Sequence, residues 1–487
     1  MRSAIDGPGT LLSPEEVRAY QPEPPTTGPG FAMIRARRRM VETGQWDGAQ
    51  CMGRRWPIGC VALEVTQRCN LDCTLCYLSE TAEAVKDLPL EELFRRIDTI
   101  FEMYGPNTDI QVTGGDPTLR PREELVAVTR RIRDRGMRPS LFTNGIRATR
   151  SLLKELAEAG LVDIAFHVDM TQQRKGFSSE VGLNQIRREY IGRARGLGLS
   201  VMFNTTVFSE NAHEISKLAA FFVANSDVVS LASFQLGADT GRGRAHGRSD
   251  FITPDSVSDA IRGGTTEALS FDFPRAGHRA CNRYAMALVC NGHAYNAYDE
   301  PEAMGSLLAA TAHMPIDRRD RRRAVTALIF SPLWTPRLLP TALRFALSKA
   351  WQMRRDLVAA RGKVSKISFF IHNFMSACSL ERDRVAACAF MVATADGPIS
   401  MCLHNARRDD FLLRPLAIRQ RANAIFWNPI TGGLQNDPHP VQAPILPPKL
   451  RKGRDVLDTT APDNGKSLTF GPARRLPSAR DAAVGRP

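Results

Sequence analysis

Apolar residues recur along the first half of the chain in two alternating patterns. In residues 89–104 they follow helical spacing, with Leu90, Leu93 and Ile97 on one face. Short apolar runs bounded by turn residues predict strands between such helices. The predicted strands are residues 61–66, 109–113, 139–143, 162–168, 200–207 and 228–236, and the predicted helices are residues 89–104, 122–135, 151–158, 184–195 and 212–224. This alternation implies parallel pairing with right-handed crossovers, so we expect an α/β fold, a partial (β/α)6 TIM-type barrel with its chemistry at the carboxyl ends of the strands.

Three closely spaced cysteines follow the first predicted strand. Cys69, Cys73 and Cys76 stand in the run Thr-Gln-Arg-Cys-Asn-Leu-Asp-Cys-Thr-Leu-Cys-Tyr. Three thiolates can hold an iron–sulfur cluster, but a cubane cluster has four irons, so one iron stays open, as in a catalytic site. The alternatives are a zinc site, which would want a fourth ligand and usually a second cysteine pair that is not nearby, or three unrelated thiols.

The Cys-x3-Cys-x2-Cys spacing, with the aromatic Tyr77 after the third cysteine, resembles the radical S-adenosylmethionine (SAM) superfamily. In that family the open iron chelates the amino and carboxylate groups of SAM. One electron then cleaves a C–S bond and releases a 5′-deoxyadenosyl radical. The resemblance therefore implies a [4Fe–4S] cluster on Cys69, Cys73 and Cys76, SAM as a cofactor, and a reducing electron donor of the flavodoxin or ferredoxin type.

Polar residues end the predicted strands and extend the resemblance. Gly114-Gly115-Asp116-Pro117 is similar to the Gly-Gly-Glu-Pro-type motif that binds the SAM amino group, with Asp in place of Glu. The same four residues would also make an ordinary turn. The family commonly contacts SAM at the end of strand three, and a Ser-x-Asp pattern often ends strand four. The resemblance therefore places these residues around SAM: Tyr77, Gly114, Gly115, Asp116, Asn144 and Asp169.

Three further polar residues near these strand ends have two readings each. His167 replaces the serine of the Ser-x-Asp pattern and is equally consistent with a ribose or substrate contact and with a satisfied core histidine. Asn204 and Thr206, on the fifth predicted strand, are consistent with ligand contact or with polar groups that satisfy the barrel interior.

A second set of cysteines lies beyond the predicted barrel. Asp396-Gly397 between two β-prone runs predicts a hairpin that brings Cys388 and Cys402 to the same end. This arrangement resembles the auxiliary-cluster modules of many radical SAM enzymes and implies an auxiliary iron–sulfur cluster. Its candidate ligands are Cys281, Cys290, Cys378, Cys388 and Cys402. The alternative is that they are buried free thiols, and Cys51 and Cys60 fit either kind.

The formal net charge of +14 is concentrated in residues 318–355, where arginines alternate with Leu, Phe and Trp. Pro332, Pro336, Pro340 and Arg337 interrupt the apolar run, which excludes a membrane-spanning helix. The segment suits the surface of an anionic membrane, and it equally suits packing against the barrel with solvated arginines. Nucleic acid is the least favoured partner, since no RNA-binding signature is present. Because no apolar signal sequence is visible, we expect a cytoplasmic protein, with peripheral contact at the inner membrane surface as an option.

We expect four parts along the chain of 487 residues. Residues 1–55 are an N-terminal extension and residues 56–240 the barrel. Residues 241–435 are an auxiliary iron–sulfur region that includes the basic segment, and residues 436–487 are a disordered basic tail.

The predicted activity is hydrogen abstraction from an unactivated C–H bond. Residues 370–405 resemble the tetraether lipid synthase branch, which joins lipid chains, but the cysteine-rich N-terminal module of that branch is absent. Another lipid, or a long apolar substrate, is therefore the inference. The alternatives are a peptide-maturation enzyme of the same superfamily and a non-enzymatic iron–sulfur electron carrier. A carrier would have no use for the Gly-Gly-Asp-Pro motif.

Overall fold

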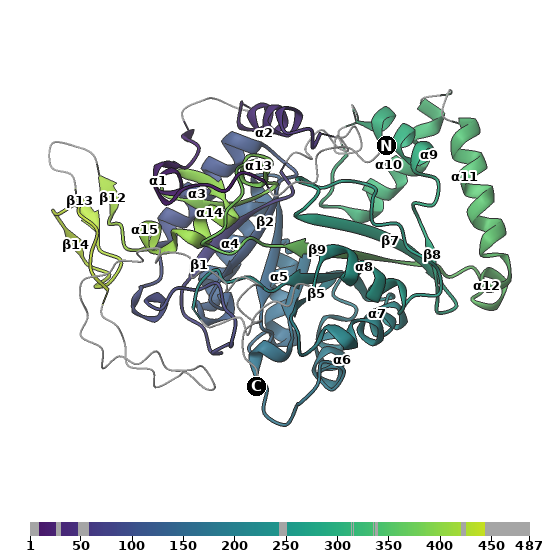
Figure 1. Ribbon diagram of the computed structural model, residues 1–487, viewed down its shortest axis with the longest axis horizontal. Coiled ribbons are helices and arrows are strands. Elements are labelled where there is room, and N and C mark those ends of the chain that lie inside the picture. The colour runs from purple at the N-terminus through teal and green to yellow at the C-terminus, as the bar shows by residue number, and fades with distance from the viewer. Residues whose placement is uncertain are drawn as a thin grey trace, which may run out of the picture.

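Most of the chain folds around one large sheet (Figure 1). The structure is a computed structural model and describes residues 9–25, 31–46, 58–242, 251–312, 314, 316–334, 336, 339–419 and 425–443. The large sheet has eleven strands in the order β11-β10-β1-β2-β3-β4-β5-β6-β9-β7-β8, and a second sheet of three strands has the order β12-β13-β14. Residues 444–487 of the predicted tail, and Cys51, lie outside the described residues.

The six predicted strand–helix units are confirmed. Neighbouring strands from β1 to β6 pair in parallel and in chain order. The strands are β1 (Cys60–Thr66), β2 (Asp109–Gly114), β3 (Arg138–Thr143), β4 (Asp163–His167), β5 (Ser200–Val207) and β6 (Val229–Leu236), and the helices between them are α3 (Leu90–Tyr104), α4 (Arg122–Asp134), α5 (Arg150–Ala159), α6 (Asn184–Ala194) and α7 (Ile215–Ala224). Short 3-10 turns are η3 (Ala82–Ala84), η4 (Pro117–Leu119), η5 (Met170–Gln172) and η6 (Ala212–Glu214).

Strands from the C-terminal part extend the same sheet at both edges. β9 (Ser365–Asn373) pairs in parallel with β6, and β10 (Phe390–Thr394) pairs in parallel with β1. Eight consecutive described strands are therefore parallel, where the sequence pattern predicts six. β7 (Asn282–Cys290), β8 (His293–Asn296) and β11 (Gly397–Ser400) complete the edges in antiparallel pairing, and β10 and β11 form the predicted Asp396-Gly397 hairpin.

The sheet curves so that β9 and β10 face each other without pairing in the described structure. The ring of Phe390 on β10 lies 5.9 Å from that of Phe370 and 4.8 Å from that of His372, both on β9 (centroid distances). Aromatic side chains therefore make the contact between these two strands, each of which is already paired on both sides, and no closed barrel is detected among the described strands.

Helices cover the outer face of the parallel strands. α3 buries Leu93, Ile97 and Ile100 against the sheet, as the helical spacing predicts. All seven residues of β1 are buried, which is typical of a parallel strand covered on both sides. The remaining elements are α1 (Pro14–Ala19), α2 (Phe31–Glu42), α8 (Pro254–Arg262), α13 (Arg382–Ala386), α14 (Met401–Ala406), α15 (Arg408–Leu412), β12 (Leu416–Arg419), β13 (Ile425–Trp427) and β14 (Leu434–Gln435).

The predicted basic segment forms helices at one end of the molecule. α9 (Pro301–Thr311), α10 (Arg321–Trp334), α11 (Leu339–Gln352) and α12 (Arg354–Ala359) lie at the right of Figure 1, far from β12–β14. Within the described residues, no helix is both long enough and apolar enough to cross a bilayer.

Two basic residues of this segment are internal, unlike the solvated arginines that the sequence suggests. The Arg318 guanidinium lies 3.0 Å from the Asp109 carboxylate at the start of β2. Arg138 at the start of β3 lies 3.1 Å from both Asp109 and Asp163. Lys349 of α11 is buried against Asp299 at 2.5 Å. These basic residues are internal because carboxylates lie next to them, which sequence spacing could not predict. The pairs Arg318–Asp109, Arg138–Asp109 and Arg138–Asp163 lie at the amino ends of the strands, and we call this charged layer the floor of the barrel.

Candidate functional site

A cavity of about 570 Å³ occupies the interior of the curved sheet. Alternate residues of the parallel strands line it, as the pleat of each strand requires. Cys69, Cys73 and Cys76 line one end of the cavity, and Asp109 and Arg318 of the floor line the other. The cavity therefore connects the cysteine loop, at the carboxyl ends of the strands, with their amino ends.

The cysteine loop is held by backbone contacts to segments far away in the sequence. The Thr74 amide donates to the Thr171 carbonyl at 2.8 Å, and the Cys76 amide donates to the Arg242 carbonyl at 3.1 Å. Burial raises the pKa of the Cys69 thiol to about 11. Burial and the neighbouring Cys76 raise the pKa of Cys73 well above its usual value. Cys69 and Cys73 are thus neutral by themselves, and a bound cation would make them thiolates at neutral pH.

The glycine pair at the end of β2 packs directly on this loop. A Cβ on Gly114 would lie 2.0 Å from the Thr66 carbonyl oxygen, and a Cβ on Gly115 would lie 2.0 Å from that of Arg68. The Gly115 amide donates to Thr66 O at 2.8 Å. Only glycine permits this approach, so the pair fixes the beginning of the cysteine loop beside β2.

The two predicted aspartates, Asp116 and Asp169, have fully occupied carboxylates. Asp116 accepts hydrogen bonds from the Thr118 amide and hydroxyl, from the Thr143 hydroxyl at 2.8 Å and from the Asn144 amide at 2.9 Å. Its side chain is completely buried and does not line the cavity. These contacts join the end of β2 to the end of β3.

Asp169 joins the end of β4 to β5 in the same way. It accepts from the Thr171 amide and hydroxyl, from the Thr206 amide at 2.8 Å and from His167 Nε2 at 2.5 Å. Burial raises the pKa of Asp169, but His167 and these hydrogen bonds outweigh burial and lower it. Both aspartates therefore tie neighbouring strand ends together, and their direct contact with SAM stays a prediction. The Asp-x-Thr spacing that they share is a signal that the sequence analysis missed.

Most of the other predicted residues line the cavity. Asn144 lies beside the loop, with its Nδ2 donating to Asn70 Oδ1 at 2.6 Å and lying 3.9 Å from Cys69 Sγ. The Tyr77 hydroxyl donates to the Gly114 carbonyl. The cavity lining also includes His167, Asn204 and Thr206. The structure thus brings the cysteines, the glycine pair, Tyr77 and Asn144 together at one end of the cavity.

Part of the chain that contains this arrangement matches a known protein family. Residues 63–222, which contain the cysteine loop, the glycine pair and Asn144, match the model of the radical SAM superfamily. Residues 63–222 therefore form a radical SAM domain. Members of this superfamily use a [4Fe–4S] cluster together with SAM.

The similarity to individual proteins is partial. The chain is 30% identical to 7,8-dihydro-6-hydroxymethylpterin dimethyltransferase of Methanocaldococcus jannaschii over 37% of this chain and 36% of that protein. It is 28% identical to PqqA peptide cyclase of Bradyrhizobium diazoefficiens over 36% of this chain and 46% of that protein. The chain thus spans less than half the length of these two curated relatives. Among solved structures, SuiB of Streptococcus suis bound to its precursor peptide SuiA has a TM-score of 0.35 and 13% identity, covering 46% of this chain and 48% of SuiB.

The side chains of the radical SAM site fit the two cofactors. Three thiols converge on one end of the cavity, which suits a cluster with one open iron. Gly114 and Gly115 line the cavity beside them, and a Cβ on either glycine would collide with the backbone of the cysteine loop. Within the described residues, no three His, Cys, Asp or Glu side chains lie close enough to hold a single metal ion.

Two arginines that the sequence analysis missed support the radical SAM loop from outside. The buried Arg242 pairs with Glu83 and lies beside Cys76. Arg408 of α15 lies 4.7 Å above the Tyr77 ring and 2.5 Å from the Glu64 carboxylate. Arg242 stands in a Gly-Arg run and Arg408 in a C-terminal helix, so neither has a local sequence signal that links it to the cysteines.

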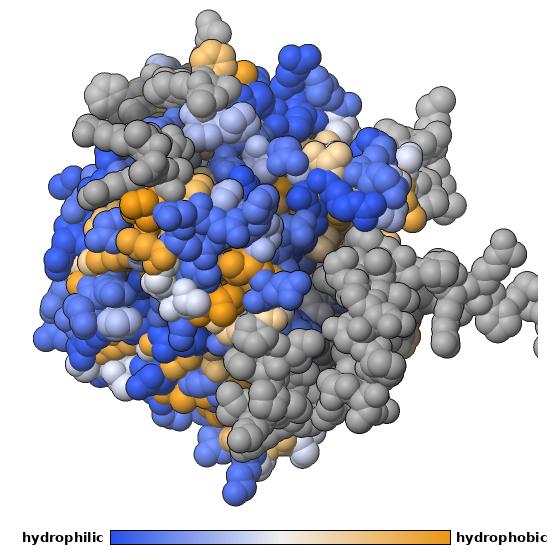
Figure 2. All heavy atoms as spheres, turned by 90° about the vertical axis from the view of Figure 1, so that its left-hand side faces the viewer, coloured by the Kyte–Doolittle hydropathy of each residue, from blue (hydrophilic) through white to orange (hydrophobic). Residues whose placement is uncertain are grey.

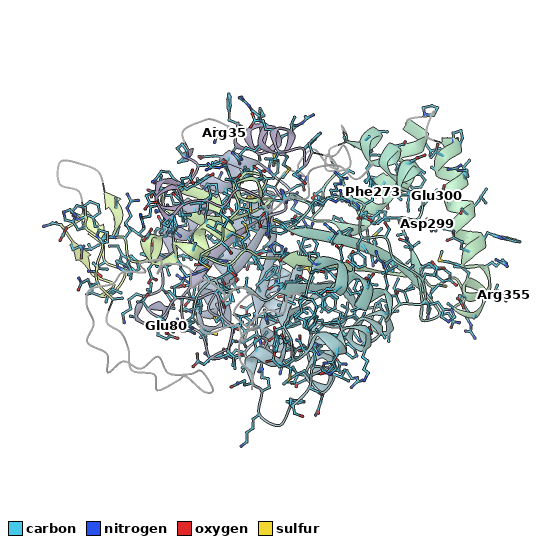
Figure 3. The ribbon with its side chains drawn as sticks, in the orientation of Figure 1. Arg35, Glu80, Phe273, Asp299, Glu300 and Arg355 are labelled. Carbon is cyan, nitrogen blue, oxygen red and sulfur yellow. The ribbon has the colours of Figure 1, made fainter. Side chains whose placement is uncertain are left out.

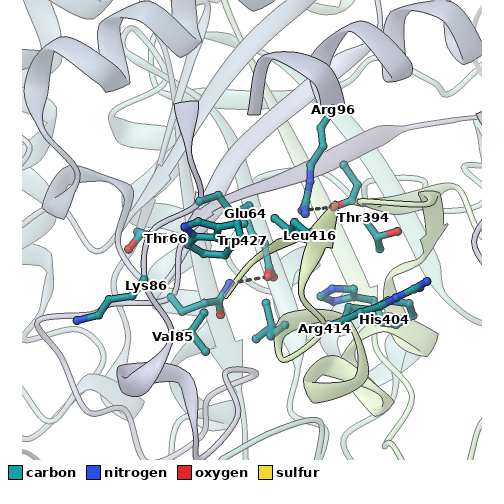
Figure 4. Close-up of a pocket in the computed structure, with 15 residues that line it drawn as sticks. Glu64, Thr66, Val85, Lys86, Arg96, Thr394, His404, Arg414, Leu416 and Trp427 are labelled. Carbon is teal, nitrogen blue, oxygen red and sulfur yellow. Dashed lines mark hydrogen bonds between the residues drawn. The ribbon is translucent and has the colours of Figure 1, made fainter. Parts of the chain in front are cut away.

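Glu64 is the centre of a buried polar group behind the loop (Figure 4). Its carboxylate accepts from Gln67 Nε2 at 2.9 Å and from Arg408 Nη1 at 2.5 Å. Burial raises the pKa of Glu64, but the Arg408 guanidinium outweighs this and lowers the pKa to about 2. The nearby His404 is buried, and burial lowers its pKa to about 3, so Arg408 supplies the positive charge for Glu64 at neutral pH.

We expect Arg408→Met to destabilise the protein by about 3–5 kcal/mol at neutral pH, because it leaves the Glu64 carboxylate buried and uncompensated. The folded-state pKa of Glu64 lies below its usual value of 4.5, so the pair stabilises the fold above that pH and loses this contribution as pH falls towards 2. The loss of thermal stability should therefore shrink in acid.

Thermal unfolding of the wild type and of Arg408→Met across this pH range measures the effect. Glu64→Gln/Arg408→Met is the control, since it removes both charges and should recover part of the loss. A destabilisation that does not change with pH would contradict the ion-pair explanation.

The second cysteine set is divided by the fold. Cys281, Cys388 and Cys402 lie close together. Burial is the main cause that raises the pKa of Cys281 and of Cys402, Cys388 adds to both, and Cys281 adds to that of Cys402. Cys290 lies at the opposite end of β7 from Cys281, about 30 Å away at the usual rise of a strand, so these two cannot share one cluster. Cys378 is exposed in the segment between β9 and α13.

All three gathered thiols already have protein partners. Cys281 Sγ accepts from Arg384 Nε at 3.2 Å, Cys388 Sγ donates to the Phe390 carbonyl at 3.0 Å, and Cys402 has a hydrogen bond with the backbone of Met375. Cys60 of β1 lies beside Cys388, and burial raises the pKa of Cys60 well above its usual value. The group of three is therefore the only part of the predicted set that the described residues bring together, and its role as cluster ligands stays a prediction.

Proposed function

We propose that this protein is an enzyme that reductively cleaves SAM and abstracts hydrogen from an unactivated C–H bond. When bound, the cluster and SAM supply a 5′-deoxyadenosyl radical for this step. The observation that carries the proposal is the cavity, which has the three cysteines at one end and continues between the strands to the floor. A substrate in this cavity would be shielded from water, which radical chemistry requires. Side chains cannot supply the electron, so the proposal includes a donor of the flavodoxin or ferredoxin type.

The proposed substrate is a lipid or another molecule with a long apolar part. The cavity has an aromatic wall along β7, β9 and β10, formed by Tyr284, Phe370 and Phe390. β3 and β5 contribute small polar groups to the lining, among them Ser140 and Ser200. An amphipathic molecule could place its apolar chain on the aromatic wall and its hydrogen-bonding groups near the serines. The resemblance of residues 370–405 to lipid-joining enzymes supports the same class.

Peptide maturation is the second candidate. The observation in its favour is the similarity to PqqA peptide cyclase, whose name describes action on a peptide. A non-enzymatic electron carrier is the least supported, because a carrier needs no cavity next to its cluster.

Deuterium transfer distinguishes the two candidate substrates. The protein, reconstituted anaerobically with iron and sulfide, is given SAM, dithionite and either perdeuterated lipid extract or a deuterated peptide library. Deuterium in 5′-deoxyadenosine from the lipid sample alone would support the lipid proposal, and transfer from peptides alone would replace it. Unlabelled 5′-deoxyadenosine in both samples would leave the radical SAM activity standing but overturn both substrates.

We further propose that Cys281, Cys388 and Cys402 contribute to an auxiliary iron–sulfur cluster. A variant with Cys69, Cys73 and Cys76 replaced by alanine should then retain iron and sulfide after reconstitution. The variant with Cys281, Cys388 and Cys402 replaced should lose a share of the iron, whereas Cys290→Ala should not. Iron and sulfide assays with circular dichroism decide the matter. A folded, iron-free first variant would show that the second set is a group of core thiols.

A further inference from the structure

α10 and α11 are consecutive helices that both expose apolar side chains, and we call the region formed by these side chains the α10–α11 face. On α10, Val325, Ile329 and Leu333 recur every four residues with exposed fractions of 53%, 66% and 62%. On α11, Leu343, Leu347 and Trp351 recur in the same way, with exposed fractions of 53%, 68% and 69%. Residues four apart lie on one side of a helix, so each helix presents a continuous apolar stripe.

Such stripes differ from the scattered apolar residues found on most protein surfaces. Single exposed leucines need no explanation, but contiguous apolar patches mark sites of interaction. Figure 2 shows the opposite end of the molecule, where β12–β14 lie, and hydrophobic side chains there form small groups among hydrophilic ones. On α10 and α11, by contrast, exposed apolar residues follow one another at four-residue intervals.

The positive charge of the same segment indicates an anionic partner. Residues 321–355 contain eight basic residues and no acidic residue: Arg321, Arg322, Arg323, Arg337, Arg344, Lys349, Arg354 and Arg355. Lys349 is internal, and Arg344 pairs with Glu300 at the start of α9 while 71% of its side chain remains exposed. Arg322, Arg354 and Arg355 are exposed, and Figure 3 shows Arg355 at the outer end of this region, away from Asp299 and Glu300.

We propose that the α10–α11 face docks on the surface of an anionic lipid bilayer. The apolar stripes would enter the boundary between headgroups and acyl chains, and the arginines would contact the anionic headgroups. Trp351 suits this depth, because its ring is apolar and its indole N–H can bond to a headgroup. The Arg354 guanidinium lies 4.3 Å from the Trp351 ring, so one cation is already placed next to the apolar anchor.

The composition of the face argues against two other occupants. A second copy of the chain would place the same basic face against itself in a symmetric dimer, and like charges repel. Nucleic acid would satisfy the arginines but leave six apolar side chains in water. A bilayer with anionic headgroups satisfies both components.

The face is fixed relative to the barrel and does not depend on the cofactors. Residues 316–320, which precede α10, are bonded to the barrel floor through Arg318 and Asp109 and through the Asn107 side chain, which donates to the Ile316 carbonyl at 2.8 Å. Membrane docking therefore holds or fails independently of the proposed radical chemistry.

The test is co-sedimentation of the full chain with vesicles of phosphatidylcholine alone or mixed with phosphatidylglycerol. We expect binding to the anionic vesicles that weakens as salt rises but does not vanish, since the apolar contribution is not screened. The variant Leu343→Ser/Leu347→Ser/Trp351→Ser should bind about tenfold or more weakly. The control Ile34→Ser/Val41→Ser/Leu434→Ser removes side chains with exposed fractions of 63%, 54% and 66% outside the face and should bind like the wild type.

A second variant, Arg322→Gln/Arg354→Gln/Arg355→Gln, provides an independent measurement if the first is unstable. Its binding should also fall about tenfold or more and should depend less on salt. Equal binding of the wild type to neutral and anionic vesicles, or binding to neither, would overturn the proposal. A concentration-dependent dimer that the serine variant abolishes, without any vesicle binding, would assign the face to a second copy of the chain.

Discussion

Cys73→Ala should reduce the formation of 5′-deoxyadenosine from SAM to the level without protein. Three thiols line the cavity end, and a [4Fe–4S] cluster held by three ligands has none to spare. Cys73 lies between the other two in the loop, and no neighbouring side chain offers a replacement thiol. The variant should fold, because alanine fills most of the space of a small buried thiol. The measurement is chromatography of anaerobic reactions with dithionite and SAM.

The matched control for this experiment is Cys290→Ala, another buried cysteine replaced by the same residue. Cys290 lies at the far end of β7, where its thiol donates to the Lys363 carbonyl, so SAM cleavage should remain near that of the wild type. Undiminished 5′-deoxyadenosine from a folded Cys73→Ala protein would overturn the assignment of the cysteine loop as the cluster site.

Gly115→Ala should have the second largest effect. The new Cβ would lie 2.0 Å from the Arg68 carbonyl oxygen and 2.4 Å from its carbonyl carbon, so backbone rather than a flexible side chain must move. The loop that carries Cys69 would have to shift by about 1 Å or more, and displacements of this size at a reactive site can cost on the order of 10²-fold in rate. We expect a comparable loss of SAM cleavage together with lower iron content.

Gly192→Ala is the control for this substitution. Gly192 lies in α6 with nothing within 4 Å of its ideal Cβ position, so alanine should be neutral or slightly stabilising. Iron content, thermal unfolding and SAM cleavage of the two variants should be compared. Wild-type values for Gly115→Ala would show that the close approach between the glycine pair and the cysteine loop is not required.

The barrel core was predictable because its signals are local. Each strand and helix from β1 to β6 has its own periodicity, and alternation fixes parallel pairing in chain order. β9 and β10 have the same local character, but they follow an insertion of more than a hundred residues. Their pairing with β6 and β1 depends on which edges remain free after the six units have formed. Sequence spacing does not contain that information.

The candidate site also has one part that the sequence predicts and another that it does not. The cysteine loop and the glycine pair have characteristic spacing, and the structure gathers them. The part played by Asp116 and Asp169 was missed, because apart from their shared Asp-x-Thr spacing a carboxylate that binds a ligand and one that joins two strand ends look alike in a sequence. The position of Arg242 and Arg408 beside the cysteine loop was not predicted, because each lies more than 150 residues from the cysteines in the chain. Arg318 was grouped with surface arginines because its partner Asp109 is also distant in the chain.

The contact between β9 and β10 is made by side chains alone. Each of these strands already has a hydrogen-bonded neighbour on both sides, β6 and β7 for β9 and β1 and β11 for β10, so neither has a free edge with which to close the ring. Phe370, His372 and Phe390 therefore act as a spacer that sets the width of the cavity between the two strands. Amide hydrogen exchange should be slow along β9 and β10 and faster along β8 and β11, the outer strands of the sheet.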